Sequence, residues 1–391
     1  MSNVIVSFAR TPIGSFLGSL TSVSSSKLGA TAISGAISRA NLDLKQVTQV
    51  IMGNVLSAGV GQAPARQAAI YSGLSDSVNC LTINKMCGSG LESIVLADQL
   101  IKNNPDQIIV AGGMENMSQS PHYLLNSRSG TRLGEGKLVD GMIVDGLWDI
   151  YNDKHMGSCA EMCADKFSIS REEQDDFAIQ SYEKSQASIS NGTFDKEIVP
   201  VDINSKKGTI TIDKDEEPQR VSFEKLKSLR PVFQKDGTIT AGNASTINDG
   251  AAACLIMSEH KSKELGLNPI ARILDYSSYS HSPEWFTTAP IFSTQKLLNQ
   301  QNLKASEVDI YEINEAFSVV TLAAIKELNL DAQKVNPYGG AVSLGHPIGA
   351  SGTRIMCTLL NFIINKDKKM GISSICIGGG EALSMLVERI Y

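Results

Sequence analysis

The chain has 391 residues and a net charge of -6, and 42% of its residues are apolar and 19% charged, a profile typical of a globular enzyme with more than one core. The mild negative charge argues against a nucleic-acid-binding surface, and the longest apolar run, residues 251–257, is far shorter than a membrane span. Seven cysteines without disulfide-framework spacing indicate reduced thiols and a cytoplasmic protein.

The first predicted element is a strand that ends at Arg10. The segment is interpreted as a strand and not as a signal peptide, because it lacks a basic start followed by an apolar core. Strand-like apolar runs then alternate with helical stretches, the pattern of a parallel or mixed α/β sheet. A strand over 80–83 precedes a helix that begins near Gly88. Its predicted buried stripe consists of Leu91, Ile94, Val95, Ala97, Leu100 and Ile101.

Three segments of the second half resemble segments of the first half, in the same order. Asn41-Leu42, ahead of the strand 50–52, resembles Asn302-Leu303, at an offset of 261 (302 minus 41). The run 88–90 resembles 350–352 at an offset of 262 (352 minus 90), and 109–115 resembles 376–381 at 266 (378 minus 112). We therefore predict a duplicated α/β fold.

The halves differ after their Gly-Gly segments. The second half runs directly into a strand over 383–387, whereas the first reaches its comparable strand, 252–257, only much later. We interpret residues from about 117 to 247 as an insertion that covers the active site. The predicted units are an N-terminal half, 1–265, and a C-terminal half, 266–391. The acidic run Asp213–Glu217 is expected to be a solvated loop.

Cys87 is predicted to lie at a strand-to-helix turn. The unpaired N–H groups of a helix N-terminus favour a thiolate and would lower the pKa of this thiol. Gly88 and Gly90 would let a ligand approach the backbone closely. Local context alone leaves a buried structural thiol equally open.

The second half supplies polar partners. His346 lies in the glycine-dense turn 339–352, directly before Pro347. Cys376 precedes three glycines at a strand end, and Asn314 follows the strand 310–313. Reactive side chains at the ends of strands from both halves indicate a shared site.

Four motifs together resemble those of the thiolase family, over essentially the whole chain. They are Asn84-Lys85-Met86-Cys87-Gly88-Ser89-Gly90, Asn314-Glu315-Ala316-Phe317, Gly345-His346-Pro347-Ile348-Gly349 and Cys376-Ile377-Gly378-Gly379-Gly380. The resemblance implies a duplicated five-layer αβαβα fold with a loop domain inserted in the N-terminal half.

The resemblance also implies a reversible condensation of two acetyl-CoA to acetoacetyl-CoA and CoA, an acetyl-CoA C-acetyltransferase activity. Cys87 would carry the acyl group, His346 would be its base, and Cys376 would exchange a proton with the second acetyl-CoA. One oxyanion hole would consist of His346 and a water held by Asn314, the other of the Cys87 and Gly378 N–H groups. CoA is substrate and product, so no cofactor is expected, and no metal.

For CoA binding, the resemblance points to Ser245 at the pantetheine, Arg220 at the nucleotide end, and Met156 and Phe317 at the acyl pocket. His155, Phe233 and Ala244 lie in matching stretches of the insertion. His155-Met156-Gly157 resembles the short-chain members of the family. A plain surface charge is an equal alternative for Arg220.

Three alternatives remain open: a degradative 3-ketoacyl-CoA thiolase of fatty-acid β-oxidation, a decarboxylating ketoacyl synthase, and a non-catalytic acyl-CoA-binding relative. The Cys376 motif disfavours the synthase. Cys159 and Cys163 would share one helix face, more simply as neutral thiols than as a metal or redox pair. The stretch 119–146 resembles the loop that joins thiolase dimers, so a homotetramer is expected, without nucleic-acid or membrane partners.

Overall fold

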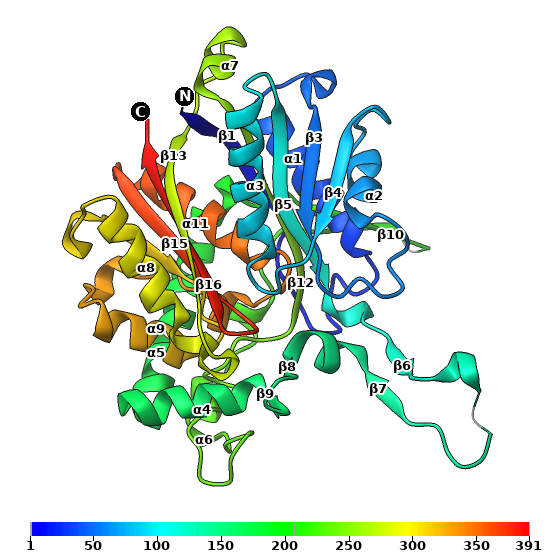
Figure 1. Cartoon of the computed structure of the whole chain (residues 1–391), viewed down its shortest axis with the longest axis vertical. Helices are drawn as coiled ribbons and strands as arrows, with labels where there is room; N and C mark the ends of the chain where they lie inside the picture. Colours follow the sequence, from blue (N-terminus) through cyan, green and yellow to red (C-terminus); the bar gives the residue numbers. More distant parts are fainter. Residues whose placement is uncertain (1, 131, 207, 391) are drawn as a thin grey trace.

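The computed structural model describes residues 2–130, 132–206 and 208–390, and at its centre lies one ten-stranded mixed sheet (Figure 1). Across the sheet the strands run β14 (Ile310–Ile313), β15 (Met370–Ile377), β16 (Glu381–Arg389), β13 (Ala271–Ser280), β1 (Asn3–Arg10), β12 (Asn248–Ser258), β5 (Ile108–Asn116), β3 (Gln49–Gly53) and β4 (Asn79–Ile83), and the short β2 (Gly14–Ser15) pairs with β12.

The two halves of the sheet repeat one pattern of strand pairing. In the first half β3 and β5 are parallel, whereas β5–β12 and β12–β1 are antiparallel. In the second half β14 and β15 are parallel, whereas β15–β16 and β16–β13 are antiparallel. The halves join where Val4 pairs with Arg272 and Ile5 with Ala271. This repeated pattern agrees with the duplication that the sequence predicts.

Asn41 and Asn302 occupy equivalent positions, after α1 (Ser25–Arg39) and α8 (Ala289–Gln300). Both have a left-handed backbone with φ of 52°, a conformation that Asn tolerates better than most residues. The next residue of each, Leu42 or Leu303, donates its N–H to a carbonyl in the helix before it, at 3.3 and 2.9 Å respectively. The first repeat match is therefore confirmed in backbone conformation.

The third repeat match is wrong in register. Val50 of β3 pairs with Val110 of β5, and Tyr311 of β14 pairs with Ile372 of β15, so the strands correspond at an offset of 262 (372 minus 110) rather than 266. Gly112 and Gly113 lie inside β5, whereas Gly378 to Gly380 form a turn after β15. By this register Met114, not Val110, is the equivalent of Cys376.

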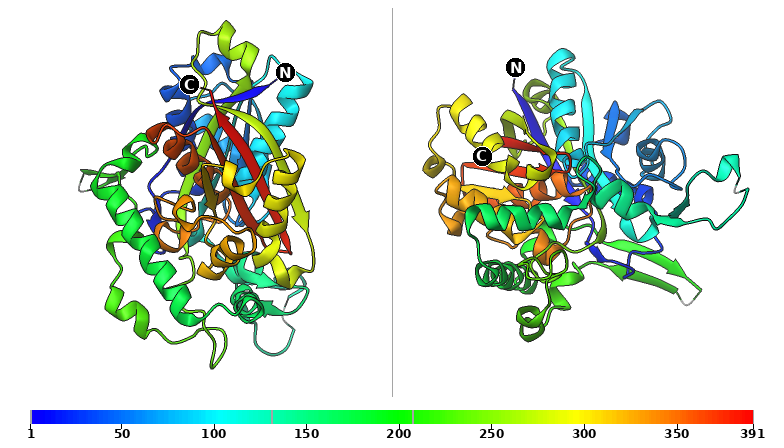
Figure 2. Two further views of the ribbon diagram at one scale, coloured as in Figure 1. Left: turned by 90° about the vertical axis from the view of Figure 1, so that its left-hand side faces the viewer. Right: turned by 60° about the horizontal axis from the view of Figure 1, so that its bottom comes forward.

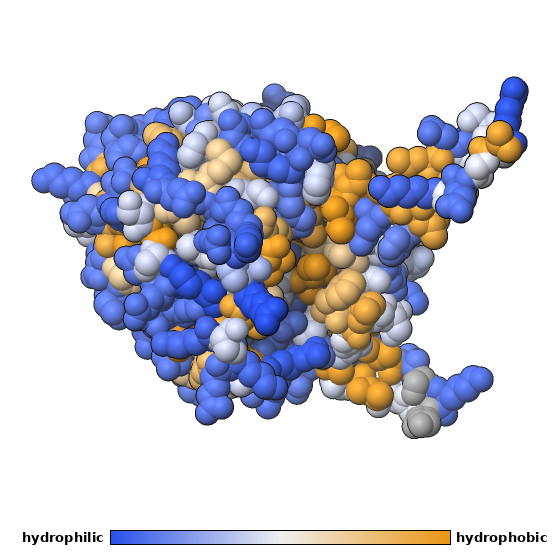
Figure 3. All heavy atoms as spheres, turned by 90° about the horizontal axis from the view of Figure 1, so that it is seen from below, coloured by the Kyte–Doolittle hydropathy of each residue, from blue (hydrophilic) through white to orange (hydrophobic). Residues whose placement is uncertain are grey.

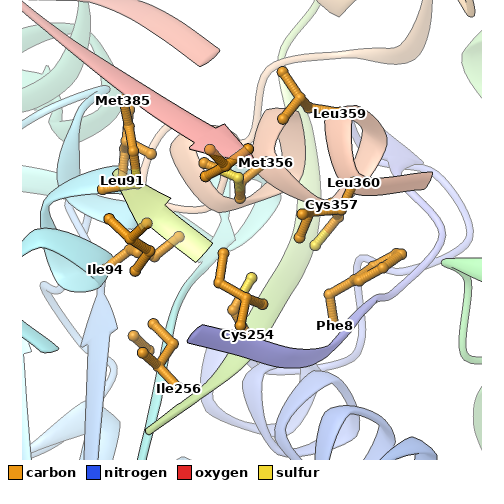
Figure 4. Packing of buried hydrophobic residues seen from close by; sticks show 14 of the residues in the cluster. Phe8, Leu91, Ile94, Cys254, Ile256, Met356, Cys357, Leu359, Leu360 and Met385 are labelled. Atoms are coloured by element: carbon orange, nitrogen blue, oxygen red, sulfur yellow. The ribbon is translucent and has the colours of Figure 1, made fainter. Parts of the chain in front are cut away.

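Two helices, α3 (Ser89–Asn103) and α11 (Ser351–Asn365), pack against each other and against both halves of the sheet. They share one apolar cluster with β1, β12 and β16, and Figure 4 shows Leu91 and Ile94 of α3 beside Met356 of α11, Cys254 of β12 and Met385 of β16. The predicted stripe on α3 is confirmed, because its members are buried or packed against this cluster.

Further helices cover the outer surfaces of the two halves (Figure 2). A second apolar cluster joins α1 and α2 (Pro64–Tyr71) to the first half of the sheet. A third joins α4 (Met156–Phe167), α8 and α9 (Ser318–Glu327) to the second half. The short α7 (Glu259–Glu264) follows β12.

The segment 117–247 runs from the end of β5 to the start of β12, two neighbouring strands. Two hairpins of this segment project from the body, an arm built on β6 and β7 and a second hairpin of β10 and β11 (Figure 2). Its elements are β6 (His122–Leu124), β7 (Leu138–Asp140), β8 (Trp148–Asp149), β9 (Lys154–His155), α4, α5 (Arg171–Ser190), β10 (Val201–Ser205), β11 (Gly208–Ile212) and α6 (Phe223–Ser228).

The acidic run Asp213–Glu217 is only in part the solvated loop expected from its composition, because Asp213 is exposed whereas Asp215 and Glu216 are held by the protein. Asp215 is buried and accepts two hydrogen bonds from the Arg10 guanidinium, at 2.7 and 2.8 Å, while Glu197 accepts a third at 2.7 Å. Glu216 accepts from the backbone N–H of Ser15 at 3.0 Å. A buried cation with paired carboxylates therefore ties the inserted segment to β1.

Glycines at the start of α3 and α11 let the two helices touch. A Cβ on Gly90 would lie 2.7 Å from the backbone nitrogen of Thr353, and one on Gly352 would lie 2.4 Å from that of Leu91. A Cβ on Gly88 would lie 2.4 Å from the side chain of Ile377. Gly88 and Gly90 are therefore packing glycines, and the expectation that they open the backbone to a ligand is wrong.

In the described part of the chain, no helix has both the length and the apolar character that a membrane span requires.

We expect Gly90→Ala to lower the free energy of unfolding by about 1–3 kcal/mol, because the added methyl group overpacks the α3–α11 contact. Urea unfolding followed by circular dichroism measures the change. Gly136→Ala is the matched control, since its Cβ would meet only the flexible end of Leu124, at 2.9 Å. Equal stability of the two variants would contradict a close backbone contact at Gly90.

Candidate active site

A cavity of about 300 Å³ opens where the two halves of the sheet and the inserted segment meet. It contains nine of the residues selected from the sequence: Cys87, His155, Met156, Phe233, Ala244, Ser245, Phe317, His346 and Gly378. Ala316 and Ile348, which belong to the quoted motifs without an assigned role, also line the cavity. The wall is completed by Met117, Gly146, Leu147, Val232, Thr240, Ala241, Thr246, Ile247 and Phe286. The predicted meeting of both halves at one site is thus seen in the lining.

Cys87 lies in the turn between β4 and α3, two residues before the helix begins. This turn is closed by hydrogen bonds from the N–H of Gly88 to the Lys85 carbonyl and of Ser89 to the Met86 carbonyl, both 3.0 Å. Met86 has a left-handed backbone, with φ of 46°. The strained turn exposes the thiol to the cavity instead of burying it in the core.

The pKa of the Cys87 thiol is raised to about 11, chiefly by burial. Backbone N–H groups of Gly378 and of Cys87 itself oppose this shift, and the nearby Glu115 carboxylate adds to it. The expectation that the helix N-terminus would lower the pKa is therefore wrong, since desolvation by the apolar neighbours outweighs the helix and N–H dipoles. Without substrate, Cys87 is a neutral thiol at physiological pH.

His346 presents an unprotonated nitrogen to the cavity. Its Nδ1 lies 2.5 Å from Ser351 Oγ, and that hydroxyl donates to the Pro347 carbonyl at 2.9 Å. Because the hydroxyl proton is thus engaged, Ser351 accepts the Nδ1 proton, and the imidazole lone pair lies on Nε2. Nε2 is buried and has no hydrogen-bond partner in the described part of the chain.

Burial lowers the pKa of His346 to about 3, and the positive charge of Arg354 contributes in the same direction. The imidazole is therefore neutral at physiological pH, so Nε2 is free to accept a proton as bond formation proceeds. The near-neutral pKa that is ordinary for histidine does not hold for His346. Burial disfavours the imidazolium ion more strongly than the sequence alone indicates.

Three buried side chains fix the backbone of the turn that carries His346. Asn248 Oδ1 accepts from the N–H of His346 itself at 2.9 Å, and Glu115 Oε2 accepts from Gly349 at 2.9 Å. Glu315 accepts from Val342 in α10 (Ala341–Leu344) at 3.1 Å. Sequence reasoning missed these anchors, although an acidic residue at the end of an apolar strand was a usable signal.

Cys376 and Asn314 lie behind the cavity lining. Cys376 is fully buried at the end of β15, and the pKa of its thiol is raised, first by burial and then by the charge that Cys87 acquires when it ionises. Asn314 follows β14, and its backbone N–H donates to the Ser374 carbonyl at 2.9 Å. Both amide atoms of its side chain are buried without a partner in the described residues. Such a group is ordinarily satisfied by ordered water.

Aromatic rings form an apolar end of the cavity. The ring of Phe233 stacks on His155 with centroids 4.7 Å apart, and Phe317 lies edge-on to Phe286 at 6.5 Å. A Cβ on Gly157 would lie 2.2 Å from the Phe233 ring, which accounts for a glycine after Met156. Met156 lies in the same cavity lining as these rings.

Of the residues predicted to contact CoA, Ser245 and Ala244 line the cavity, whereas Arg220 does not. Ser245 lines the cavity, and its N–H donates to the Ala316 carbonyl at 3.0 Å, while Ala244 forms a β-bridge with Phe317. Arg220 lies outside the cavity lining, with 56% of its side chain exposed, and pairs with Glu216 at 3.6 Å. Contact of Arg220 with a ligand stays a prediction.

The described residues contain no group of three or more His, Cys, Asp or Glu side chains placed to hold a metal ion. Cys159 and Cys163 are both buried in α4. The arrangement supplies a thiol nucleophile, a neutral base, a second thiol and backbone N–H donors, which is the set needed for acyl transfer to sulfur followed by carbanion chemistry.

Two family profiles match the chain, "Thiolase, N-terminal domain" over residues 3–260 and "Thiolase, C-terminal domain" over residues 267–389. The chain is 50% identical to "Acetyl-CoA acetyltransferase 2" of Arabidopsis thaliana, over 99% of this chain and 96% of that protein. It is also 50% identical to "Acetyl-CoA acetyltransferase" of Escherichia coli, over 99% of each, and 49% identical to "Acetyl-CoA acetyltransferase ERG10, cytosolic" of Gibberella zeae, over 99% and 98%.

Among solved structures, the fold matches that of Acat5 thiolase from Ascaris suum in complex with coenzyme A, with a TM-score of 0.94, 44% identity and full coverage of both chains. It matches the acetyl-CoA acetyltransferase of Bacillus anthracis with a TM-score of 0.97 and 38% identity, over 100% of this chain and 99% of that one.

We expect alkylation of Cys87 by iodoacetamide to accelerate about tenfold per pH unit from pH 7 to 10, because only the thiolate reacts and its pKa is about 11. The rate is followed by mass spectrometry, with a Cys80→Ser background to remove the other half-buried thiol. Free cysteine, which levels off above a pKa of about 8.5, is the reference. A plateau near neutral pH would mean that a thiolate–imidazolium pair already exists in the resting enzyme.

Proposed function

Because this chain belongs to the thiolase family and is an acetyl-CoA acetyltransferase, we propose that Cys87 carries the acyl group in a reversible condensation of two acetyl-CoA to acetoacetyl-CoA and CoA. The observation that carries the proposal is the convergence, in one cavity, of the Cys87 thiol, the unprotonated Nε2 of His346 and the N–H of Gly378.

In the first half-reaction, Cys87 Sγ attacks the thioester carbonyl of acetyl-CoA and its proton passes to His346 Nε2. The C–S bond to CoA then breaks, and CoA leaves with that proton. With a thiol pKa of about 11 and an imidazole pKa of about 3, a free ion pair is unfavourable, so proton transfer accompanies attack instead of preceding it. The negative charge therefore forms on the carbonyl oxygen.

Two sets of donors stabilise the two oxyanions of the reaction. The N–H groups of Cys87 and Gly378 point toward Sγ in the resting enzyme, and we assign them to the oxygen of the acyl group that forms there. A Cβ on Gly378 would lie 3.5 Å or more from its nearest neighbour, so this glycine leaves room for the substrate. His346 and a water on the unpaired amide of Asn314 serve the thioester of the second acetyl-CoA.

In the second half-reaction, Cys376 removes a proton from the methyl group of the second acetyl-CoA. The resulting carbanion attacks the acyl-enzyme carbonyl, and the C–S bond to Cys87 breaks. Burial keeps the Cys376 thiol neutral at rest, so in this proposal its proton passes first to His346 Nε2, and from there to the Cys87 sulfur when the C–S bond breaks. In the reverse direction Cys376 returns the proton and CoA cleaves acetoacetyl-CoA.

We assign the pantetheine to the wall formed by Ser245 and Ala244, and the nucleotide end to the exposed Arg220. His155 and Phe233 stack beside the entrance to the acyl pocket, which Met156 and Phe317 line. The preference for acetyl and acetoacetyl groups over long acyl chains is supported by the relatives named acetyl-CoA acetyltransferase. The alternative of a degradative enzyme with broad chain-length range has no comparable support from these relatives.

We extend the proposal to the layers of the fold, its two units, its assembly and its location. The three apolar clusters support a five-layer arrangement with α3 and α11 at its centre, divided into units 1–265 and 266–391. The arm on β6 and β7 exposes apolar residues (Figure 3), with Leu133 97% and Leu138 65% exposed, which supports assembly into a homotetramer through this arm. A cytoplasmic location is supported by the relative that is named cytosolic.

Cys87→Ala and Cys376→Ala are expected to fail at different steps. Cys87→Ala should lower kcat for acetoacetyl-CoA thiolysis by more than about 10⁴-fold and form no acyl-enzyme, because the nucleophile is gone. Cys376→Ala should lower kcat by about 10²–10⁴-fold yet still be acetylated by acetyl-CoA, because it lacks only the acid–base group. Steady-state assays and intact-protein mass spectrometry measure both.

Cys254→Ala serves as the control for loss of a buried cysteine away from the cavity. Retained thiolysis in Cys87→Ala, or acylation lost in Cys376→Ala as completely as in Cys87→Ala, would refute the assigned roles. Comparing acetoacetyl-CoA with a long-chain 3-ketoacyl-CoA in the same assay decides between the acetyl-specific and degradative functions.

Arg220→Ala is expected to raise KM for CoA about five- to tenfold while kcat stays unchanged, because a lost phosphate contact costs about 1 kcal/mol or more. Initial-rate kinetics with CoA varied measure the effect. Lys227→Ala, an exposed basic residue in α6 paired with Asp176, is the control. An unchanged KM would leave Arg220 as a plain surface charge.

A further inference from the structure

The two turns that hold the Cys87 and Gly378 N–H groups come from opposite halves of the chain. The first turn is tightly fixed, since the Lys85 N–H donates to Ser89 Oγ at 2.8 Å and that hydroxyl donates to the Met86 carbonyl at 2.7 Å. Its position within the N-terminal half is therefore determined by short-range hydrogen bonds.

The second turn, Gly378 to Gly380, joins β15 to β16 and consists of glycines only. Gly379 and Gly380 follow Gly378 with φ of 98° and 89°, and a Cβ on Gly379 would meet no atom within 4 Å. The carbonyl of Gly380 accepts from the His281 N–H at 2.9 Å, which holds the far end of the turn to β13. Successive glycines have much backbone freedom to lose, so such a turn needs an external restraint to hold one N–H in place.

One ion pair connects these turns. Lys85 Nζ lies 2.9 Å from Glu381 Oε2, with 30% and 35% of the two side chains exposed. Lys85 is two residues before Cys87, and Glu381 begins β16, three residues after Gly378. The pair therefore spans the two halves at the level of the N–H groups assigned to the acyl oxygen.

We propose that the Lys85–Glu381 ion pair sets the separation of these two turns, so that Lys85 and Glu381 are positioning residues for acyl transfer to Cys87. The inference rests on the proposed function of the Cys87 and Gly378 N–H groups. Neither charged group lines the cavity, so their effect on the reaction passes through the backbone. An N–H displaced by a fraction of an ångström donates poorly to the developing oxyanion.

The neighbouring charge makes reversal of Lys85 a severe test. Glu92 of α3 is half-buried, and its pKa is raised by burial, lowered by Lys85 and raised by Glu381, which places all three groups close together. With Lys85→Glu, three acidic groups would face one another and push the turns apart. With Glu381→Lys, two cations would oppose each other near one carboxylate.

The experiment compares Lys85→Glu, Glu381→Lys and the double variant with both changes. We expect each single variant to lower kcat for thiolysis about tenfold with KM for acetoacetyl-CoA changed less than twofold, because a displacement near 1 Å costs up to about a hundredfold. The double variant, which restores an ion pair of opposite polarity, should recover kcat to within about twofold of the parent. Thermal unfolding of all three checks that they fold.

A double reversal of Lys261 and Glu264 on α7, an ion pair of 2.8 Å remote from the cavity, is the matched control and should leave kcat unchanged. Single variants with kcat within twofold of the parent, or a double variant no better than the singles, would overturn the inference. Mass spectrometry of Cys87 acetylation in rapidly quenched samples distinguishes a failure of the positioning role from a failure of the proposed function. If Cys87 of the parent enzyme is never acetylated by acetyl-CoA, both the proposed function and the positioning role are refuted. Equal acetylation rates in the parent and in Lys85→Glu refute the positioning role alone.

Discussion

The close crossing of α3 and α11 is the constraint on which the rest of the molecule depends. Gly90 and Gly352 allow the first turns of the two helices to touch backbone to backbone, and the turns carrying Cys87 and His346 lie directly before them. A side chain at either glycine would separate the helices and, with them, Cys87 and His346. Catalytic geometry and core packing are therefore one problem in this fold, not two.

Burial, more than local dipoles, decides the charge of the resting site. The Cys87 thiol and the His346 imidazole are both neutral, and the side-chain amide of Asn314 has no hydrogen-bond partner among the residues that the structure describes. A site of this kind holds donors and acceptors oriented but uncharged, and strong interactions appear only when a substrate oxygen gains charge. The second ring of buried groups, such as Glu115, Asn248 and Ser351, holds these orientations in place.

The sequence predicts the strand–turn–helix position of Cys87, the duplicated α/β order and nine of the twenty cavity residues, because motifs and periodicity are local signals. It failed where the outcome depends on distant segments. The roles of Gly88 and Gly90 are set by Ile377 and Thr353, from the other half of the chain. The burial of Asp215 is set by Arg10, and the pKa directions of Cys87 and His346 by apolar walls that no single motif contains. The register error arose because a Gly-Gly pair has one appearance in sequence and two conformations in structure.

The corrected register makes Met114 of the first half the equivalent of Cys376 of the second half. Met114 of β5 and Cys376 of β15 occupy equivalent positions, so the same place in the repeat holds a buried thioether in one copy and an ionisable thiol in the other. An internally duplicated protein could have kept two identical catalytic centres. In the proposed mechanism the two copies have different tasks instead, because Cys87 of the first half carries the acyl group and His346 and Cys376 of the second half transfer protons. Neither half alone would then contain the complete catalytic set, so the two halves would depend on each other for activity as well as for packing.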